Sequence, residues 1–282
     1  GTFSGIQSDG TAQTLTKYGA ISRVINLLDY VSFADSDNTT GINSALADAS
    51  PINTDGTYKK SAALSTNEAW VYSGLVWAPA GTYFASNIKI PTGVQFVGAG
   101  RGGFGLEKKY AVTRFQQLES AKATDFVTFY DDEDVDDRMG HIVIANMFFL
   151  GPRSGDNDSG AFQGTAANNG IRFYGENDSQ DVDITETTVL NNIAVRGFGN
   201  NAIQCTGGFS GLRLQDIVIH LCGGYAIELA AETTTTAYNG FRASMVRMNA
   251  CTNGGIYVHD LAKWNGTPSG CMTFSSIYYE MG

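Results

Sequence analysis

Carboxyl, imidazole and guanidinium side chains, which can carry acid–base chemistry and bind anions, gather in the C-terminal half of the chain. Asp216, His220 and Glu228 follow one another, and Arg247 comes after them. Glycoside cleavage generally uses two carboxyl groups, one as proton donor and one as base or nucleophile. The sequence therefore nominates Glu228 as the acid or base and Asp216 as its carboxylate partner, with His220 and Arg247 as substrate contacts.

Two aromatic residues complete this candidate set. Tyr257 and Trp264 could bind a sugar ring, although packing of a loop would explain Trp264 equally well. An elimination reaction would instead need a base near the α-carbon of a uronate and a cation for its carboxylate. For any single candidate, an ordinary solvated strand face is the alternative explanation.

A sequence repeat must position these residues. Its copies are Asn192–Ile203, Asp216–Ile227, Met245–Ile256 and a shorter one at 276–282. The matching isoleucines Ile203, Ile227 and Ile256 are 24 and 29 residues apart. Each copy reads as an alternating strand, a Gly/Asn turn and a second strand, with no room for a helix. The pattern predicts an all-β fold, a right-handed parallel β-helix; a β-sandwich with accidental spacing is the alternative.

Alignment of the copies predicts which side chains share a face. The expected inward columns are Ile193, Ile217, Val246 and Ile277; Val195, Ile219, Met248 and Tyr279; and Phe198, Cys222 and Cys251. The expected outward columns are Arg196, His220, Asn249 and Glu280; and Arg172, Gln204, Glu228 and Tyr257. Side chains in one column would lie about 4.8 Å apart from layer to layer and could line a groove.

The N-terminal half reads as the start of such a stack. Residues 1–28 form a lead-in with one short strand, residues 29–140 the first strands with a capping helix, and residues 141–282 the repeats, which we expect to continue beyond the chain end. The helix is predicted at 38–47, capped by Asp37, Asn38 or Thr39. Its apolar face would cover the open end of the stack.

Charge and hydropathy limit the partners. The net charge is −10 and the pI about 4.7, which argues against nucleic acid and anionic membranes, because binding to phosphate relies on Lys and Arg. A polysaccharide remains compatible with this balance. No apolar run of about 18 residues exists, so we expect no membrane insertion. We also expect no signal peptide at the N-terminus, which lacks a charged segment followed by an apolar one.

Neither a cofactor nor a metal site is predicted. The cysteines Cys205, Cys222, Cys251 and Cys271 form no C-x-x-C pair, and free stacked thiols at Cys222 and Cys251 are favoured over a disulfide. The stretch 98–103 matches G-x-G-x-x-G but lacks the following helix that a dinucleotide site needs. The stretch 156–160 begins like a calcium loop, but Ala167 stands where the bidentate Glu belongs.

Beyond these physical arguments, the chain resembles the phage tailspike and pectate-lyase-like β-helix proteins. The resemblance rests on three stretches: Ile42–Leu46, Trp77–Tyr83 with its Pro-Ala-Gly-Thr-Tyr, and Val97–Gly102 with its Gly-Arg-Gly. Together with the repeats, it covers most of residues 24–282. The Gly-Asp-Gly turn usual before the helix is replaced by Phe33–Ser36. The resemblance implies a homotrimeric spike that binds or degrades bacterial surface polysaccharide, and it transfers no catalytic residue.

The preferred hypothesis is therefore a phage tailspike in the virion tail, made in the host cytoplasm, which depolymerises capsule or O-antigen by hydrolysis rather than elimination. Its N-terminal segment would bind other tail proteins. A non-catalytic receptor-binding or structural spike is the second hypothesis. A secreted, monomeric pectate-lyase-like enzyme is the third, and the missing calcium ligands and signal peptide count against it.

Overall fold

The structure is a computed structural model that describes residues 24–50, 74–102, 112–129, 142–152, 168–174, 188–206, 209–230, 238–259 and 272–280. It is mostly β, with 11% helix and long parallel sheets. Among these residues, no helix combines the length and the apolar character needed to cross a membrane. The candidate Trp264, the calcium-like stretch 156–160 and Cys271 lie outside the described residues.

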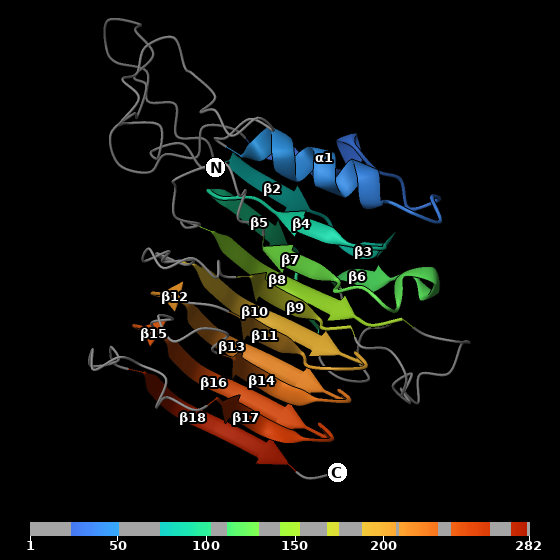
Figure 1. Cartoon of the computed structure of the whole chain (residues 1–282). Coiled ribbons are helices and arrows are strands. Elements are labelled where there is room, and N and C mark those ends of the chain that lie inside the picture. The colour runs from blue at the N-terminus through green and yellow to red at the C-terminus, as the bar shows by residue number, and fades with distance from the viewer. Residues whose placement is uncertain are drawn as a thin grey trace, which may run out of the picture.

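Two large parallel sheets dominate the described part of the chain (Figure 1). The ten-stranded sheet contains β1 (Val24–Asn26), β2 (Gly74–Ala78), β3 (Gly81–Ala85), β5 (Val94–Gly98), β6 (Thr113–Gln117), β8 (Val143–Leu150), β10 (Val189–Arg196), β13 (Arg213–His220), β16 (Arg242–Asn249) and β18 (Thr273–Glu280). The six-stranded sheet contains β4 (Ile88–Ile90), β7 (Val127–Phe129), β9 (Ile171–Tyr174), β11 (Ile203–Thr206), β14 (Tyr225–Ala230) and β17 (Gly254–Val258). A two-stranded sheet joins β12 (Phe209–Ser210) to β15 (Tyr238–Asn239). The chain passes repeatedly from the ten-stranded to the six-stranded sheet, with two strands in a row on the ten-stranded sheet at β2 and β3 and at β5 and β6. We call each such passage, with its strands on both sheets, a layer.

The predicted alignment of the repeats is confirmed as the register of the ten-stranded sheet. The aligned residues are Ile193, Ile217, Val246 and Ile277 in one column and Val195, Ile219, Met248 and Tyr279 in another. The first three members of each column are buried, whereas Tyr279 in β18 is 37% exposed. Each fully buried aliphatic side chain stabilises the fold by about 1.5–3 kcal/mol, so these columns are a large part of the core energy.

The outward column on the same sheet is also in the predicted register, since Arg196, His220, Asn249 and Glu280 are paired across β10, β13, β16 and β18. Although it is in register with this outward column, the Arg196 side chain is only 8% exposed.

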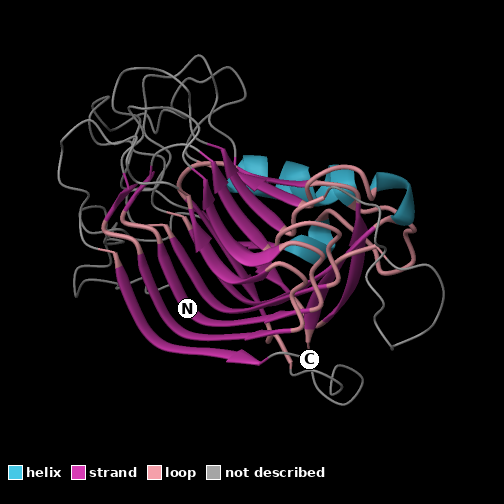
Figure 2. Ribbon diagram, turned by 60° about the horizontal axis from the view of Figure 1, so that its bottom comes forward, coloured by secondary structure: helices cyan, strands magenta, loops and turns pink. Residues whose placement is uncertain are grey.

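A left-handed backbone position bends every long strand at the same place (Figure 2). These positions, with φ between 52° and 60°, are Asn146, Asn192, Asp216, Met245 and Ser276. Asn and Asp tolerate this conformation better than other residues with a side chain. The Nδ2 of Asn192 in β10 also donates to the Oδ1 of Asn146 in β8 at 2.7 Å. The bend lets one strand line two faces of the stack.

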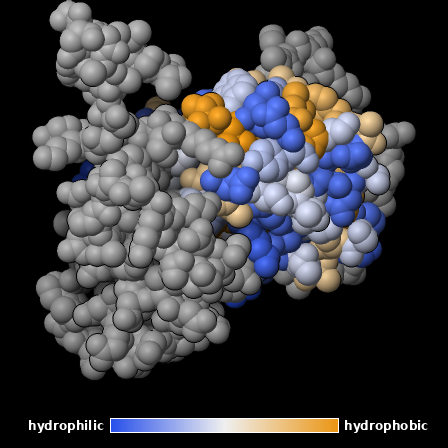
Figure 3. Space-filling view, turned by 90° about the horizontal axis from the view of Figure 1, so that it is seen from above, coloured by the Kyte–Doolittle hydropathy of each residue, from blue (hydrophilic) through white to orange (hydrophobic). Residues whose placement is uncertain are grey.

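The helix α1 (Thr39–Ala49) closes one end of the stack, as predicted. Ile42, Ala45 and Leu46 are fully buried against the first strands, and the Oδ1 of Asp37 accepts the backbone N–H of Thr39 at 2.8 Å. Figure 3 looks onto this end, where the described residues present a largely hydrophilic surface with small hydrophobic patches. The amphipathic helix thus replaces an exposed strand edge by a polar surface. The short 3-10 helices are η1 (Leu27–Asp29) and η3 (Glu119–Ala121).

The cysteines of the described core are free thiols, as predicted for Cys222 and Cys251. Cys205, Cys222 and Cys251 are all buried. Burial raises the pKa of the Cys205 thiol far above its ordinary value. These thiols therefore serve as small apolar core side chains.

Candidate active site

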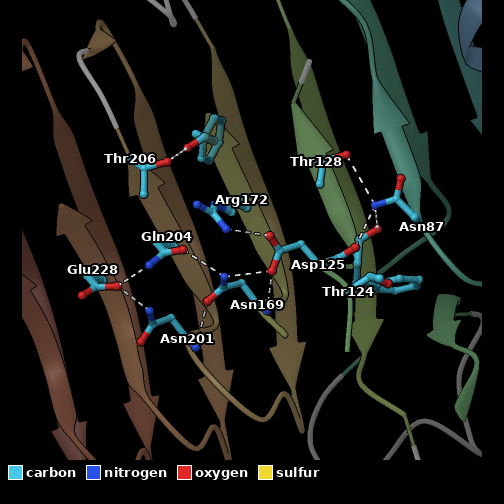
Figure 4. A network of polar contacts seen from close by, with 12 residues as sticks. Asn87, Thr124, Asp125, Thr128, Asn169, Arg172, Asn201, Gln204, Thr206 and Glu228 are labelled. Atoms are coloured by element: carbon cyan, nitrogen blue, oxygen red, sulfur yellow. Dashed lines mark hydrogen bonds and ion pairs between the residues drawn. The ribbon is translucent and has the colours of Figure 1, made fainter. Parts of the chain in front are cut away.

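The outward face of the six-stranded sheet carries a network of polar side chains (Figure 4). The predicted column Arg172, Gln204, Glu228 and Tyr257 is confirmed by the pairing of β9, β11, β14 and β17. Alternation along these short strands directs the column away from the core, because the neighbouring residues Ile203 and Ile227 point inward and are buried.

Glu228 is the most constrained carboxylate of this face. Its Oε2 accepts hydrogen bonds from the Nδ2 of Asn201 at 2.5 Å and the Nε2 of Gln204 at 2.6 Å. Its Oε1 lies 2.7 Å from the Nε2 of His259. The Glu228 side chain is only 13% exposed, whereas that of His259 is 37% exposed. One carboxylate oxygen thus accepts two amide donors, and the other lies within hydrogen-bond distance of a partly exposed imidazole.

A ladder of side-chain amides holds these groups in place. The Oδ1 of Asn201 accepts the backbone N–H of Tyr225 at 2.7 Å, and the backbone N–H of Asn201 donates to the Oδ1 of Asn169 at 3.1 Å. Asn169 in turn donates to the Oδ1 of Asp125 from its backbone N–H and from Nδ2, both at 2.8 Å. Asn169 and Asn201 are each only 2% exposed. The orientation of Glu228 is therefore fixed by buried groups.

The other end of the network is an ion pair. Arg172 places a guanidinium nitrogen 3.2 Å from the Oδ2 of Asp125, whose side chain is 9% exposed. Asp125 and Glu228 are separated by three layers, or about 14 Å at the usual strand spacing. Paired glycosidase carboxylates lie between about 5 and 9.5 Å apart. Asp125 therefore fits the role of anchoring the ladder better than that of a second catalytic carboxylate.

Aromatic rings flank Glu228 on the side of the last layers. Tyr225 and Tyr257 are stacked at 4.7 Å between ring centroids, and the Tyr257 ring meets His259 edge-on at 4.5 Å. Tyr257 is 39% exposed. An exposed aromatic face beside a polar group suits the mixed apolar and hydroxyl surface of a sugar ring.

The structure divides the predicted site residues between the two sheets. Glu228 and Tyr257 lie side by side on the six-stranded sheet. His220, Arg247 and Asp216 lie on the ten-stranded sheet. The sites nominated from the sequence therefore form two groups, with no contact between Asp216 and Glu228 in the described part of the chain.

On the ten-stranded sheet, Asp216 and Arg247 contact side chains of other strands and loops of the protein. Asp216 occupies the left-handed bend with φ 52°, and its Oδ1 accepts an ion pair from Arg101 at 3.0 Å. Arg247 lies 3.5 Å from Glu280 and over the Tyr278 ring at 5.7 Å. The catalytic role of Asp216 and the substrate contacts of His220 and Arg247 stay predictions.

Sequence reasoning missed His259 and Asn201 as partners of Glu228. His259 could have been found by extending the predicted register, since it stands two residues after Tyr257 and so shares its face. Asn201 lies in a turn, where residue type alone gives no direction for the side chain. Among the described residues, no group of three His, Cys, Asp or Glu side chains could hold a metal ion.

No family model and no curated protein matches the chain. Solved structures do resemble it. A candidate glycosyl hydrolase from Parabacteroides merdae aligns with a TM-score of 0.51 at 11% identity, covering 92% of this chain and 98% of that one. The enzymatically active domain of tailspike protein 2 from bacteriophage CBA120 aligns with a TM-score of 0.50 at 15% identity. That alignment covers 92% of this chain but 35% of the tailspike domain. At these identities the likeness is one of fold.

Proposed function

We propose that the chain is a right-handed parallel β-helix of a phage tailspike that binds and hydrolyses bacterial surface polysaccharide, with Glu228 at its active site. The observation that carries the proposal is the arrangement around Glu228. A nearly buried carboxylate is held by Asn201 and Gln204, touches His259, and lies beside the exposed ring of Tyr257. The fold of the tailspike domain and of the Parabacteroides protein supports the same class of function.

In this proposal Glu228 moves a proton through Oε1, because Oε2 is occupied by two amide donors. From its more exposed position His259 takes a proton from the attacking water as its oxygen bonds to the anomeric carbon, and the pair gives a proton to the glycosidic oxygen as the C–O bond breaks. General acid–base transfer by such a positioned side chain accelerates a reaction by about 10²–10⁴-fold. Tyr257 would orient the sugar ring against the pair.

The decisive experiment compares Glu228→Gln with the native chain on a panel of bacterial capsules and lipopolysaccharides. Polymer size and the absorbance of unsaturated uronates are followed together, so that hydrolysis and elimination are distinguished. We expect the native chain to shorten one polymer and Glu228→Gln to lose at least 100-fold in rate, in line with loss of a general acid or base. Unchanged turnover in the variant would remove Glu228 from the mechanism.

Glu119→Gln is the matched control. Glu119 lies on η3 and pairs with Lys122 at 2.8 Å, and it makes none of the hydrogen bonds that hold Glu228, so the same isosteric change should leave the rate unchanged. Equal thermal midpoints for both variants would show that an activity loss in Glu228→Gln does not come from unfolding.

A non-catalytic receptor-binding spike is the second candidate, and one observation favours it. The only other carboxylate of the described network, Asp125, lies about 14 Å away by layer spacing, beyond the separation of paired glycosidase carboxylates. Tight binding of a polysaccharide by the native chain without any shortening of the polymer would support this candidate.

The assembly belongs to the same proposal. A tailspike would be a homotrimer in the virion tail that acts outside the host cell and joins other tail proteins through residues 1–28. Light scattering of the full chain tests the trimer, and a mass of one chain at micromolar concentration would contradict it.

A further inference from the structure

A second polar surface lies on the ten-stranded sheet, where β13, β16 and β18 begin. Arg213, Arg242 and Thr273 form one outward column in register, and all three are exposed. The next outward column consists of Gln215, Ser244 and Ser275. Neighbours within a column are about 4.8 Å apart and the columns about 6.7 Å apart. The six residues form a grid with two adjacent arginines and no acidic member.

Unlike Arg101 and Arg247, the two arginines have no carboxylate partner among the described residues. Arg101 pairs with Asp216 at 3.0 Å, and Arg247 lies 3.5 Å from Glu280. No ion pair within the described residues involves Arg213 or Arg242. This is notable in a chain with net charge −10, where acidic side chains outnumber basic ones.

Placing the two guanidinium groups side by side costs stability. Like charges directly opposite each other on neighbouring strands repel, and the fold gains nothing from them without a counter-ion. An anion bound between them would remove the repulsion. Each guanidinium presents a planar fork of donors that fits a carboxylate or phosphate, so a pair of them surrounds one anionic group with several charge-assisted hydrogen bonds.

We propose that Arg213 and Arg242 bind the carboxylate of an acidic sugar residue in a polysaccharide, with Gln215 and Ser244 meeting the neighbouring sugar hydroxyls. The site rests on the proposed function only for the class of polymer, because it lies on a different sheet from Glu228. Its amide and hydroxyl column favours a sugar chain over a nucleic acid, which would call for aromatic stacking or further cations.

The test is direct binding of the full chain to immobilised polygalacturonate, a polymer of uronates, with dextran as the neutral polymer and dextran sulfate as a sulfated one. We expect binding to polygalacturonate that weakens with salt, and none to dextran. Arg213→Gln with Arg242→Gln should weaken the affinity at least tenfold, which corresponds to about 1.4 kcal/mol. The double lysine variant, R213K with R242K, keeps the charge but loses the forks and should bind with intermediate affinity.

Lys122→Gln is the control for loss of one positive charge, since Lys122 lies on the surface beside η3 and should leave the affinity unchanged. The proposal is overturned if the native chain binds no acidic polymer, if the double glutamine variant binds within twofold of it, or if dextran is bound equally. A preference for dextran sulfate over polygalacturonate would overturn the assignment to a carboxylate. Single-stranded DNA is included as a further probe, and tighter binding of it would overturn the assignment to a polysaccharide. Binding is measured without cleavage, so loss of cleavage in Glu228→Gln and loss of binding in the double glutamine variant are separate results.

Discussion

The left-handed bend in the long strands gives a sharp energetic prediction at Met245. Four of the five bend positions carry Asn, Asp or Ser, and the fifth is Met245 with φ 53°. Met245 is 50% exposed, so its side chain contributes little packing for its size. We expect replacement of Met245 to reveal the cost of this conformation.

The magnitude follows from two opposing contributions. Full burial of a Met side chain stabilises a fold by about 1.5–3 kcal/mol, so half-burial amounts to about 1 kcal/mol that both Met245→Ala and Met245→Asn lose. A left-handed conformation costs an ordinary residue about 1–2 kcal/mol, and Asn avoids part of that cost through local hydrogen bonding. Met245→Asn should therefore be close to native in stability and about 0.5–1 kcal/mol more stable than Met245→Ala. Met245→Gly should also be more stable than Met245→Ala, because glycine has no Cβ to be strained in the left-handed conformation.

Urea unfolding followed by circular dichroism measures these differences, provided that the dependence on urea is the same for all variants. In a chain of this size 1 kcal/mol also shifts the thermal midpoint by about 2–4 °C. Equal stability of the Asn, Gly and Ala variants would refute the reasoning, because it would mean that the bend imposes no left-handed strain. An Asn variant less stable than the Ala variant would do so more strongly.

Three further predictions follow from the core and the network. Ile217→Ala should lose about 2–5 kcal/mol in urea unfolding because Ile217 is fully buried in its column, whereas Val218→Ala, at a partly buried position, should lose much less. Burial raises the pKa of Cys205 above its ordinary 9.0, so the folded state keeps a proton that the unfolded chain releases. The free energy of unfolding should therefore fall as the pH rises above 9, and it should fall less steeply in Cys205→Ala. Identical pH curves for the two proteins would contradict this. Asn201→Ala should lower the thermal midpoint and the rate of polymer cleavage together, since it removes a donor to Glu228 and leaves the part-buried backbone N–H of Tyr225 without its acceptor. A native midpoint would show that the ladder is dispensable.

The sequence determined the periodic features of this protein. Alternation of apolar and polar residues fixes which side of a strand faces the core, and the spacing of the repeats fixes which residues become neighbours in adjacent layers. The column of Gln204, Glu228 and Tyr257 was predictable for this reason. The helix with buried Ile42 and Leu46 was predictable as well, because its capping residues and apolar spacing are local.

Only the tertiary structure decided which groups meet Glu228. Asp216 and Glu228 are close in the sequence, yet a turn places them on different sheets, and Asp216 instead pairs with Arg101, which lies 115 residues away. The contact between His259 and Glu228 joins two layers through rotamers and turn geometry. Strand periodicity is a local property that residue types reveal directly. The meeting of side chains from separate layers depends on the path of every connecting turn, and that path is set by the packing of the whole stack.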